Sequence, residues 1–492
     1  MPENIDLPGL SAPFAIMIFS LKGEPMGYFT SKTLTGAAVA ASGVALWFAP
    51  VPEGLAPEAW QLFALFFATI AAIIAGVVPI FTASVISLSL SILTGLLTPA
   101  EAYSGFSKSF ILLIVVAFLV ARGVVLSGLG KRVALLIIRK FGSSTLGLGY
   151  SMVATDMLIA PAFPSNTARS GVLFPIVQSL AHDSGSKVAD GTRRKTGSFL
   201  MLNSMAGISI SSALWLTAMA ANPVGAGIAA EMGVAIDFGS WLLASLLPSM
   251  AAFAAVPYLI YRLFPPERKA TPEAPRIAEE ELRRMGPVHR NEWITGFTFV
   301  AMVLLWALSG VLGLDKTAIA LAGLGMLMLT NVFTVHDLKE QGEALETFVW
   351  FAALYTLSTY LNQFGFMGYL GEGIASHLEG FSWPVVYVML VVIYVLIHYL
   401  FVSQTAHMLA LFGVFLGVGL EAGVPGAMMA LMLLFATNFN SVITPQGSSA
   451  NVLFLSSGYV TAREVYRYGG IVTAANTLIY LGVGSLWMML LF

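Results

Sequence analysis

The chain has 492 residues, of which 57% are hydrophobic and only 10% are charged. Soluble globular domains carry about 25% charged residues, so the composition excludes that class and indicates an integral membrane protein surrounded by a lipid bilayer. The net charge of −2 gives no sign of nucleic-acid binding. The absence of cysteine excludes disulfides and thiolate metal sites.

Residues 1–32 are interpreted as an N-terminal leader. The segment 10–21 is apolar but short, contains Pro13, and is not clearly followed by a small-residue cleavage site. Nothing in this stretch resembles an Arg/Ser-rich transit peptide. We therefore expect a multi-pass protein of a bacterial inner membrane.

A membrane-spanning helix needs about 20 mainly apolar residues. Candidate spans in chain order are 34–50, 60–78, 81–97, 109–125, 241–264, 293–314, 318–333, 347–364 and 470–492. The segment 265–292 carries the only dense charge and is interpreted as a cytoplasmic linker. Together with the interrupted helices described next, the pattern predicts an all-α polytopic membrane protein with about 11 transmembrane helices.

Short polar motifs break two long apolar blocks, about 146–180 and about 383–420. The first motif is Ser165-Asn166-Thr167, and the second is Ser403-Gln404-Thr405. The two pieces of the first block are each about 17 residues long, which is marginal for a span, so we expect two re-entrant helical hairpins. With hairpins, most Lys- and Arg-rich loops fall on one side, as the positive-inside rule requires.

The halves of the chain repeat one another. Two further apolar helices, about 198–223 and about 427–451, are interrupted and end at Ala-Asn pairs that contain Asn222 and Asn451. Phe110 and Phe348 open corresponding apolar helices, at the same distance before each serine motif. A half repeated with opposite topology is typical of an inverted-repeat transporter, with residues 33–264 and 293–492 as the two repeats.

The breaks predict one binding site for a small anion. Irregular chain at membrane depth is tolerated only where it is buried or lines a cavity, and helix N-termini that begin after each motif attract negative charge. A single Ser or Thr here more often bonds a neighbouring helix, but the duplication favours a site. The candidate substrate-binding residues are Ser165, Asn166, Thr167, Ser403, Gln404, Thr405, Thr217, Asn222, Thr444 and Asn451.

Two residues that are or can become cationic occupy matched positions just after the motifs. A charge inside the membrane costs about 3 kcal/mol or more, which makes Arg169 and His407 functional candidates. We expect them to compensate the charge of the anion. The alternatives are that Arg169 pairs with Asp156 and that His407 is an ordinary core histidine. No catalytic set, metal cluster or phosphate-binding loop is present, so we expect neither an enzyme nor an ATP-driven pump.

With these motifs in view, residues 33–492 resemble the divalent anion/sodium symporter family. Ser165-Asn166-Thr167 and Ser403-Gln404-Thr405 are similar to the family's two hairpin tips, and the Ser-x-Thr-Ala-His run that ends at His407 is most similar to its citrate/succinate and oxoglutarate/malate antiporter branch. The resemblance implies a homodimer, elevator-type alternating access and di- or tricarboxylate substrates. It implies no cofactor, with Na⁺ as a possible coupling ion near Asn166 and Gln404.

The expected function is therefore secondary transport of succinate, malate, citrate or oxoglutarate as an anion antiporter. Gln404 replaces the Asn of sodium-coupled members, and Arg169 and His407 place positive charge where those members hold Na⁺. The alternative is a Na⁺-coupled dicarboxylate symporter of the same fold. A membrane-embedded enzyme and a channel are disfavoured, because the polar residues concentrate at two matched breaks.

Overall fold

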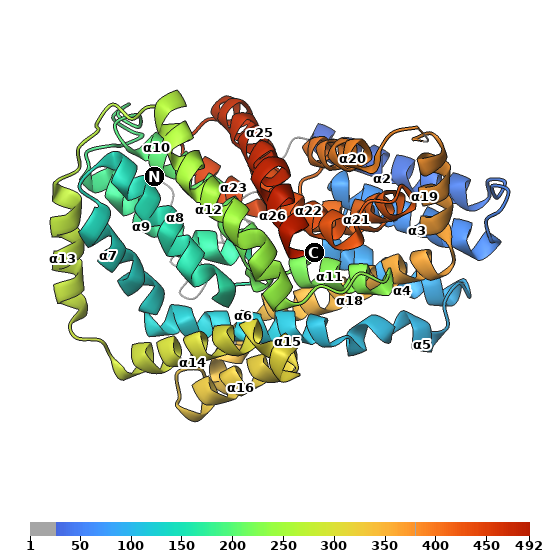
Figure 1. The fold of residues 1–492 in the computed structure, drawn as a ribbon, viewed down its shortest axis with the longest axis horizontal. Helices are drawn as coiled ribbons and strands as arrows, with labels where there is room; N and C mark the ends of the chain where they lie inside the picture. The colour runs from blue at the N-terminus through green and yellow to red at the C-terminus, as the bar shows by residue number, and fades with distance from the viewer. Residues whose placement is uncertain (1–25, 379) are drawn as a thin grey trace.

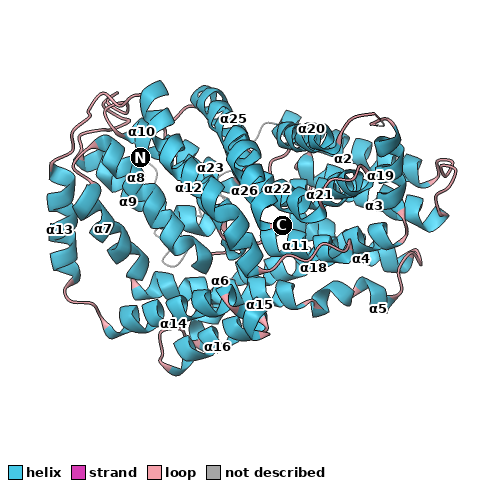
Figure 2. Cartoon of the chain, in the orientation of Figure 1, coloured by secondary structure: helices cyan, strands magenta, loops and turns pink. Residues whose placement is uncertain are grey.

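The computed structural model describes residues 26–378 and 380–492. These residues form helices and connecting loops, with no strand among them (Figure 2). The predicted all-helical fold is therefore confirmed. Residues 1–25 of the predicted leader lie outside the described chain, and residues 26–32 already belong to the first described helix.

The first half of the chain contains the following helices, in order: α2 (Met26–Trp47), α3 (Pro57–Ile74), α4 (Ile80–Leu93), α5 (Pro99–Ala102), α6 (Ser109–Ser127), α7 (Leu129–Phe141), α8 (Thr145–Ile159), α9 (Asn166–Asp183), α10 (Gly197–Leu214), α11 (Ala221–Glu231) and α12 (Phe238–Leu263). Short 3₁₀ turns lie between some of them, including η1 (Ser104–Ser107) and η3 (Leu216–Ala218).

The charged linker contains α13 (Glu273–Met285), whose exposed face carries pairs such as Arg283–Glu279. The second half contains α14 (Arg290–Ala307), α15 (Ser309–Leu312), α16 (Lys316–Leu329), α17 (Val335–Lys339), α18 (Gly342–Gln363), α19 (Phe366–Ser376), α20 (Trp383–Ile397), α21 (Gln404–Glu421), α22 (Gly426–Phe439), η5 (Asn440–Ile443), α23 (Ser449–Ser456), α24 (Ala462–Glu464), α25 (Gly470–Ile479) and α26 (Ser485–Leu491). π-Helical turns join the last three into one long apolar rod.

Eight helices of the described chain are long and apolar enough to cross a membrane by length and composition. Two of the eight are the arms of the second predicted hairpin, Trp383–Leu400 and Gln404–Glu421. The predicted number of about 11 spans therefore stays a prediction.

The hairpin arms are short. Helices α8 and α20 have 15 residues each, and α9 and α21 have 18 each. At 1.5 Å per residue these arms are about 22–27 Å long. The 18-residue arms are as long as the candidate spans Pro57–Ile74 and Gly197–Leu214, so the re-entrant course of the two hairpins stays a prediction.

The two interrupted helices end in the same hydrogen-bond pattern. The Asn222 amide donates to the carbonyls of Ser212 and Trp215, at 3.1 and 3.2 Å, across the gap between α10 and α11. The Asn451 amide donates to the carbonyls of the matching residues, Ser441 and Thr444, at 2.7 and 3.1 Å. Each asparagine caps one carbonyl just before the break, that of Ser212 or Ser441, and shares a second with a backbone N–H, that of Ala218 on Trp215 or of Gly447 on Thr444. Both breaks are therefore built in the same way.

The helices form two groups that meet at the hairpin tips. Helix α18 packs mainly against α4 and α6 and less extensively against α3, α11 and α21. Helix α9 packs against α10 and α23, and α21 packs against α19 and α22. In Figure 1 helices α6, α14 and α16 lie along the lower edge, and α8, α9, α12 and α25 lie above them. Helix α13 lies beside α7 at one end of the molecule. This arrangement places both polar motifs between the two groups.

Candidate functional site

A cavity of about 240 Å³ lies at the meeting point of the two hairpin tips. All six motif residues line it: Ser165, Asn166, Thr167, Ser403, Gln404 and Thr405. The opposite wall comes from α18, with smaller contributions from α4, α6 and α23. The structure therefore brings together the two motifs that the sequence places in separate halves.

Both tips are N-terminal helix caps. The Ser165 hydroxyl accepts a hydrogen bond from the backbone N–H of Ala168 at 3.2 Å, and the Ser403 hydroxyl accepts one from Ala406 at 3.3 Å. Both serines have extended backbone conformations, as N-cap residues do. Helices α9 and α21 thus begin at the cavity wall, and the positive ends of two helix dipoles face the same small volume.

An amide pair joins the two tips. The Asn166 amide nitrogen donates to the side-chain oxygen of Gln404 at 2.9 Å, although the residues are 238 positions apart. The Gln404 amide nitrogen donates in turn to the carbonyls of Thr437 and Asn438, at 2.8 and 3.1 Å. Gln404 therefore fixes the first tip to the end of α22.

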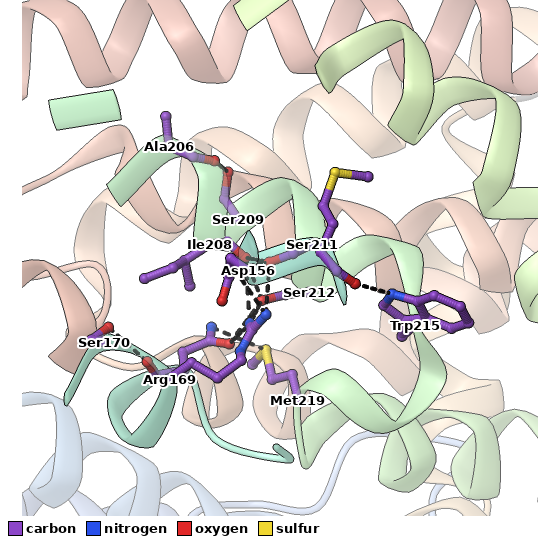
Figure 3. Close-up of polar contacts among 12 residues, drawn as sticks. Asp156, Arg169, Ser170, Ala206, Ile208, Ser209, Ser211, Ser212, Trp215 and Met219 are labelled. Carbon is purple, nitrogen blue, oxygen red and sulfur yellow. Dashed lines mark hydrogen bonds and ion pairs between the residues drawn. The ribbon is translucent and has the colours of Figure 1, made fainter. Parts of the chain in front are cut away.

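Arg169 lies behind the first tip and is fully buried (Figure 3). Its Nη1 lies 3.1 Å from Asp156 Oδ2 and 2.7 Å from the Ser211 hydroxyl. Its Nη2 donates to Asn166 Oδ1 at 2.6 Å and to Ser212. Arg169 does not line the cavity. The structure thus has the Asp156 pairing that the sequence left open as an alternative, and direct charge compensation by Arg169 stays a prediction.

His407 is also fully buried and does not line the cavity. Its ring packs against Tyr394, with centroids 4.2 Å apart, and against His398 and Phe401, each at 5.0 Å. Its Nδ1 lies 3.3 Å from the Asn440 amide nitrogen. These contacts favour the core-histidine alternative, and a charge-compensating role for His407 stays a prediction.

Four of the proposed binding residues lie outside the cavity lining. The Thr217 hydroxyl donates to the Pro161 carbonyl at 2.9 Å, and Thr444 is fully buried. Asn222 and Asn451 direct their amides at the broken helices, as described above. The sequence recognised these positions as special because they mark the breaks, but in the structure they stabilise the breaks.

The sequence did not identify the contributions of α18 and α23 to the cavity. Glu343, Thr347 and Trp350 line it from α18, and Ser449 lines it from α23, where its hydroxyl lies 2.5 Å from that of Thr167. Ser449 lies in the same break of the second interrupted helix as Thr444. Its place in that break is the sequence signal that could have identified Ser449 as a cavity residue. Among the described residues, no group of three His, Asp or Glu side chains could hold a metal ion.

These features define a class of protein: a multi-pass membrane carrier with a polar cavity lined by two neighbouring helix N-termini. A model of the transmembrane region of sodium:sulfate symporters matches residues 31–492. The chain therefore belongs to the sodium:sulfate symporter family, as the resemblance of its motifs predicted.

Curated relatives cover nearly the whole chain. The chain is 40% identical to a putative malate transporter, YflS, of Bacillus subtilis, over 91% of this chain and 94% of the relative. It is 40% identical to dicarboxylate transporter 1 of spinach chloroplasts, over 91% and 79%. It is 32% identical to an L-tartrate/succinate antiporter of Escherichia coli, over 89% and 94%. These relatives are transporters, so the prediction that the chain is a carrier rather than an enzyme is confirmed.

A solved structure shares the fold. The YdaH transporter of Alcanivorax borkumensis aligns with a TM-score of 0.54 at 15% identity, covering 82% of this chain and 89% of that one. At that identity the likeness shows the fold alone.

Proposed function

We propose that this protein is an antiporter that exchanges dicarboxylates across a bacterial plasma membrane. The substrate class is that of succinate and malate, with oxoglutarate and the tricarboxylate citrate as further candidates. The names of the relatives support this proposal, since they include a malate transporter, a dicarboxylate transporter and a tartrate/succinate antiporter. A homodimer with elevator-type movement is part of the same proposal.

The cavity has the chemistry for a small dianion. The N-termini of α9 and α21 both begin at its wall, and each can stabilise one carboxylate. Hydroxyl groups of Ser165, Thr167, Ser403 and Thr405 can donate hydrogen bonds to carboxylate oxygens. Two positive helix ends at one small cavity suit a substrate with two carboxylates, such as a C4-dicarboxylate.

One observation favours exchange over Na⁺ coupling. The Arg169 guanidinium donates to Asn166 Oδ1 at 2.6 Å, and Gln404 Oε1 accepts from Asn166 at 2.9 Å. Side-chain and carbonyl oxygens at broken helices are the groups that bind Na⁺ in secondary transporters. Here the tip oxygens already bond to a guanidinium and an amide. Na⁺-coupled uptake of the same substrates is the second candidate, favoured by the family to which the chain belongs.

Labelled succinate uptake into proteoliposomes tests the proposal. Two variables are crossed: unlabelled succinate inside the vesicles, and an inward Na⁺ gradient replaced in matched samples by N-methylglucamine. We expect uptake that requires internal succinate and is unaffected by Na⁺. Uptake into empty vesicles that depends on Na⁺ would contradict exchange and establish the symporter. If succinate is not transported, malate, oxoglutarate, citrate and tartrate are tested in the same design.

A further inference from the structure

A carboxylate faces the first hairpin tip across the cavity. Glu343, in the first turn of α18, lines the cavity, and its Oε1 accepts a hydrogen bond from the Ser165 hydroxyl at 3.4 Å. A negative charge in the wall of an anion site opposes the binding of a dianion. Its position therefore needs a reason other than substrate affinity.

Glu343 has no cationic partner among the described residues. Glu340, three residues earlier, instead pairs with Arg122 at 2.8 Å. The Glu343 side chain is exposed at the cavity. The Ser165 hydroxyl is the hydrogen-bond donor that the structure gives it.

The Ser165–Glu343 bond differs in kind from the other bonds of the first tip. Asn166 bonds Gln404, and Thr167 lies against Ser449, so these contacts stay among the hairpin tips and the broken helices. Glu343 belongs to α18, which packs most extensively against α4 and α6 and less against α3, α11 and α21. The Ser165–Glu343 bond thus links the hairpin to the other helix group directly across the cavity.

We propose that Glu343 is a latch that holds the empty carrier, an inference that rests on the proposed exchange function. Without substrate, the Ser165 hydroxyl bonds Glu343 and anchors the hairpin tip to α18. A dicarboxylate needs the same hydroxyl, so its binding breaks the bond. The repulsion between the dianion and the Glu343 carboxylate, strong in a small cavity of low dielectric constant, moves that side chain away from the tip.

The latch gives a physical reason for obligatory exchange. The unloaded hairpin stays bonded to α18 and moves slowly, whereas the loaded hairpin is released and moves freely. The repulsion from Glu343 lowers the affinity for the dianion, and the same repulsion breaks the bond between Glu343 and Ser165. Glu343 is in this sense a positioning residue that acts through Ser165 and not a substrate ligand.

The test compares Glu343→Ala, Glu343→Gln and the control Glu346→Ala in proteoliposomes. Glu346 is exposed in the same first turns of α18 but does not line the cavity. For each protein, labelled succinate uptake is measured with and without internal succinate, and the ratio of the two rates is compared with that of the wild type. Succinate affinity of the purified protein is measured separately by calorimetry.

We expect Glu343→Ala to raise uptake into empty vesicles by about tenfold or more relative to exchange, because a hydrogen bond to a charged acceptor is lost. Glu343→Gln keeps an acceptor oxygen without the charge, so its ratio should lie between those of the wild type and Glu343→Ala. Both variants should bind succinate several-fold more tightly, and Glu346→Ala should match the wild type.

The latch would be overturned by an unchanged ratio in Glu343→Ala while the wild type remains an obligatory exchanger, or by an equal rise in Glu346→Ala. Weaker succinate binding in the Glu343 variants would overturn it as well, because it would make Glu343 a ligand. Failure of the proposed function is distinguishable, since it appears in the wild type as Na⁺-driven uptake into empty vesicles. The affinity measurement then still decides whether Glu343 opposes the substrate.

Discussion

At the scale of single residues, Asn222 and Asn451 hold the breaks in α10–α11 and α22–α23 open. Each is the side-chain donor to one buried carbonyl that has no backbone donor, that of Ser212 or Ser441, and leaving a buried polar group unsatisfied costs about 1–3 kcal/mol. We expect Asn222→Ala and Asn451→Ala each to lower the free energy of unfolding by about 1–3 kcal/mol. Thermal unfolding in detergent measures this as a lower midpoint.

The exposed Asn291, at the start of α14, provides the matched control, and Asn291→Ala should leave the midpoint nearly unchanged. A midpoint for Asn222→Ala equal to that of the control would show that water or neighbouring groups satisfy the carbonyls of Ser212 and Trp215. The asparagine would then have no role in stabilising the break.

The same residues show what a sequence can reveal of a site. The tip serines were predictable, because a serine at the point where a long apolar block is interrupted is well suited to cap the N-terminus of the helix that follows. Asn222 and Asn451 were recognised as special, but a polar residue at a break can bind a ligand or the chain itself, and only the contacts separate the two. Glu343 gave no signal at all, because an acidic residue in the first turn of a helix is ordinary.

At the scale of elements, Arg132 of α7 fastens the linker to α14. It pairs with Glu292, with one N–O distance of 2.9 Å, and donates to the carbonyls of Gly286 and Pro287. The Arg132 and Glu292 side chains are only 8% and 1% exposed. Removing one partner of a buried pair costs about 3–5 kcal/mol, so Arg132→Ala should lower the unfolding midpoint and speed tryptic cleavage of the linker.

The adjacent pair Lys131–Glu281 is the matched comparison, because it joins α7 to α13 at 3.1 Å but is 52% and 30% exposed. Exposed pairs contribute about 0–1 kcal/mol, so Lys131→Ala should change neither the midpoint nor the cleavage rate measurably. If Lys131→Ala and Arg132→Ala change the midpoint and the cleavage rate equally, the burial of the ion pair does not determine how much it stabilises the linker.

The amphipathic pattern of α7 and the charge pairs of α13 were visible in the sequence. Their packing against each other was not, because it buries apolar residues that lie far apart along the chain, such as Leu135 of α7 and Leu282 of α13. The hairpin arms were predictable for the opposite reason. Their signal is local, consisting of a helix breaker, an N-cap serine and two apolar flanks of limited length.

At the scale of the whole molecule, some ion pairs join the two helix groups to each other, and others join helices of the same group. Lys108, just before α6, bonds Glu231 at the end of α11 at 2.8 Å, and the Tyr355 hydroxyl donates to the same carboxylate at 3.0 Å. The hydrogen bond from Lys108 holds the pKa of Glu231 below its usual value. The bridge is therefore present at neutral pH, and its stabilisation is lost only as the pH falls through that lowered pKa. The pair Arg122–Glu340, also at 2.8 Å, instead joins α6 to α17.

These two pairs provide a test of elevator movement. In that movement the hairpins and broken helices, including α11, slide past α6 and α18. The chain contains no cysteine, so introduced cysteine pairs are the only thiols. A short bifunctional methanethiosulfonate should abolish succinate exchange in Lys108→Cys/Glu231→Cys, and a reductant should restore it, because the bridge fixes α11 to α6. The same reagent should leave exchange intact in Arg122→Cys/Glu340→Cys, whose bridge joins two parts of the group that stays in place. Exchange that survives cross-linking of the first pair would mean that α11 does not move relative to α6 during transport.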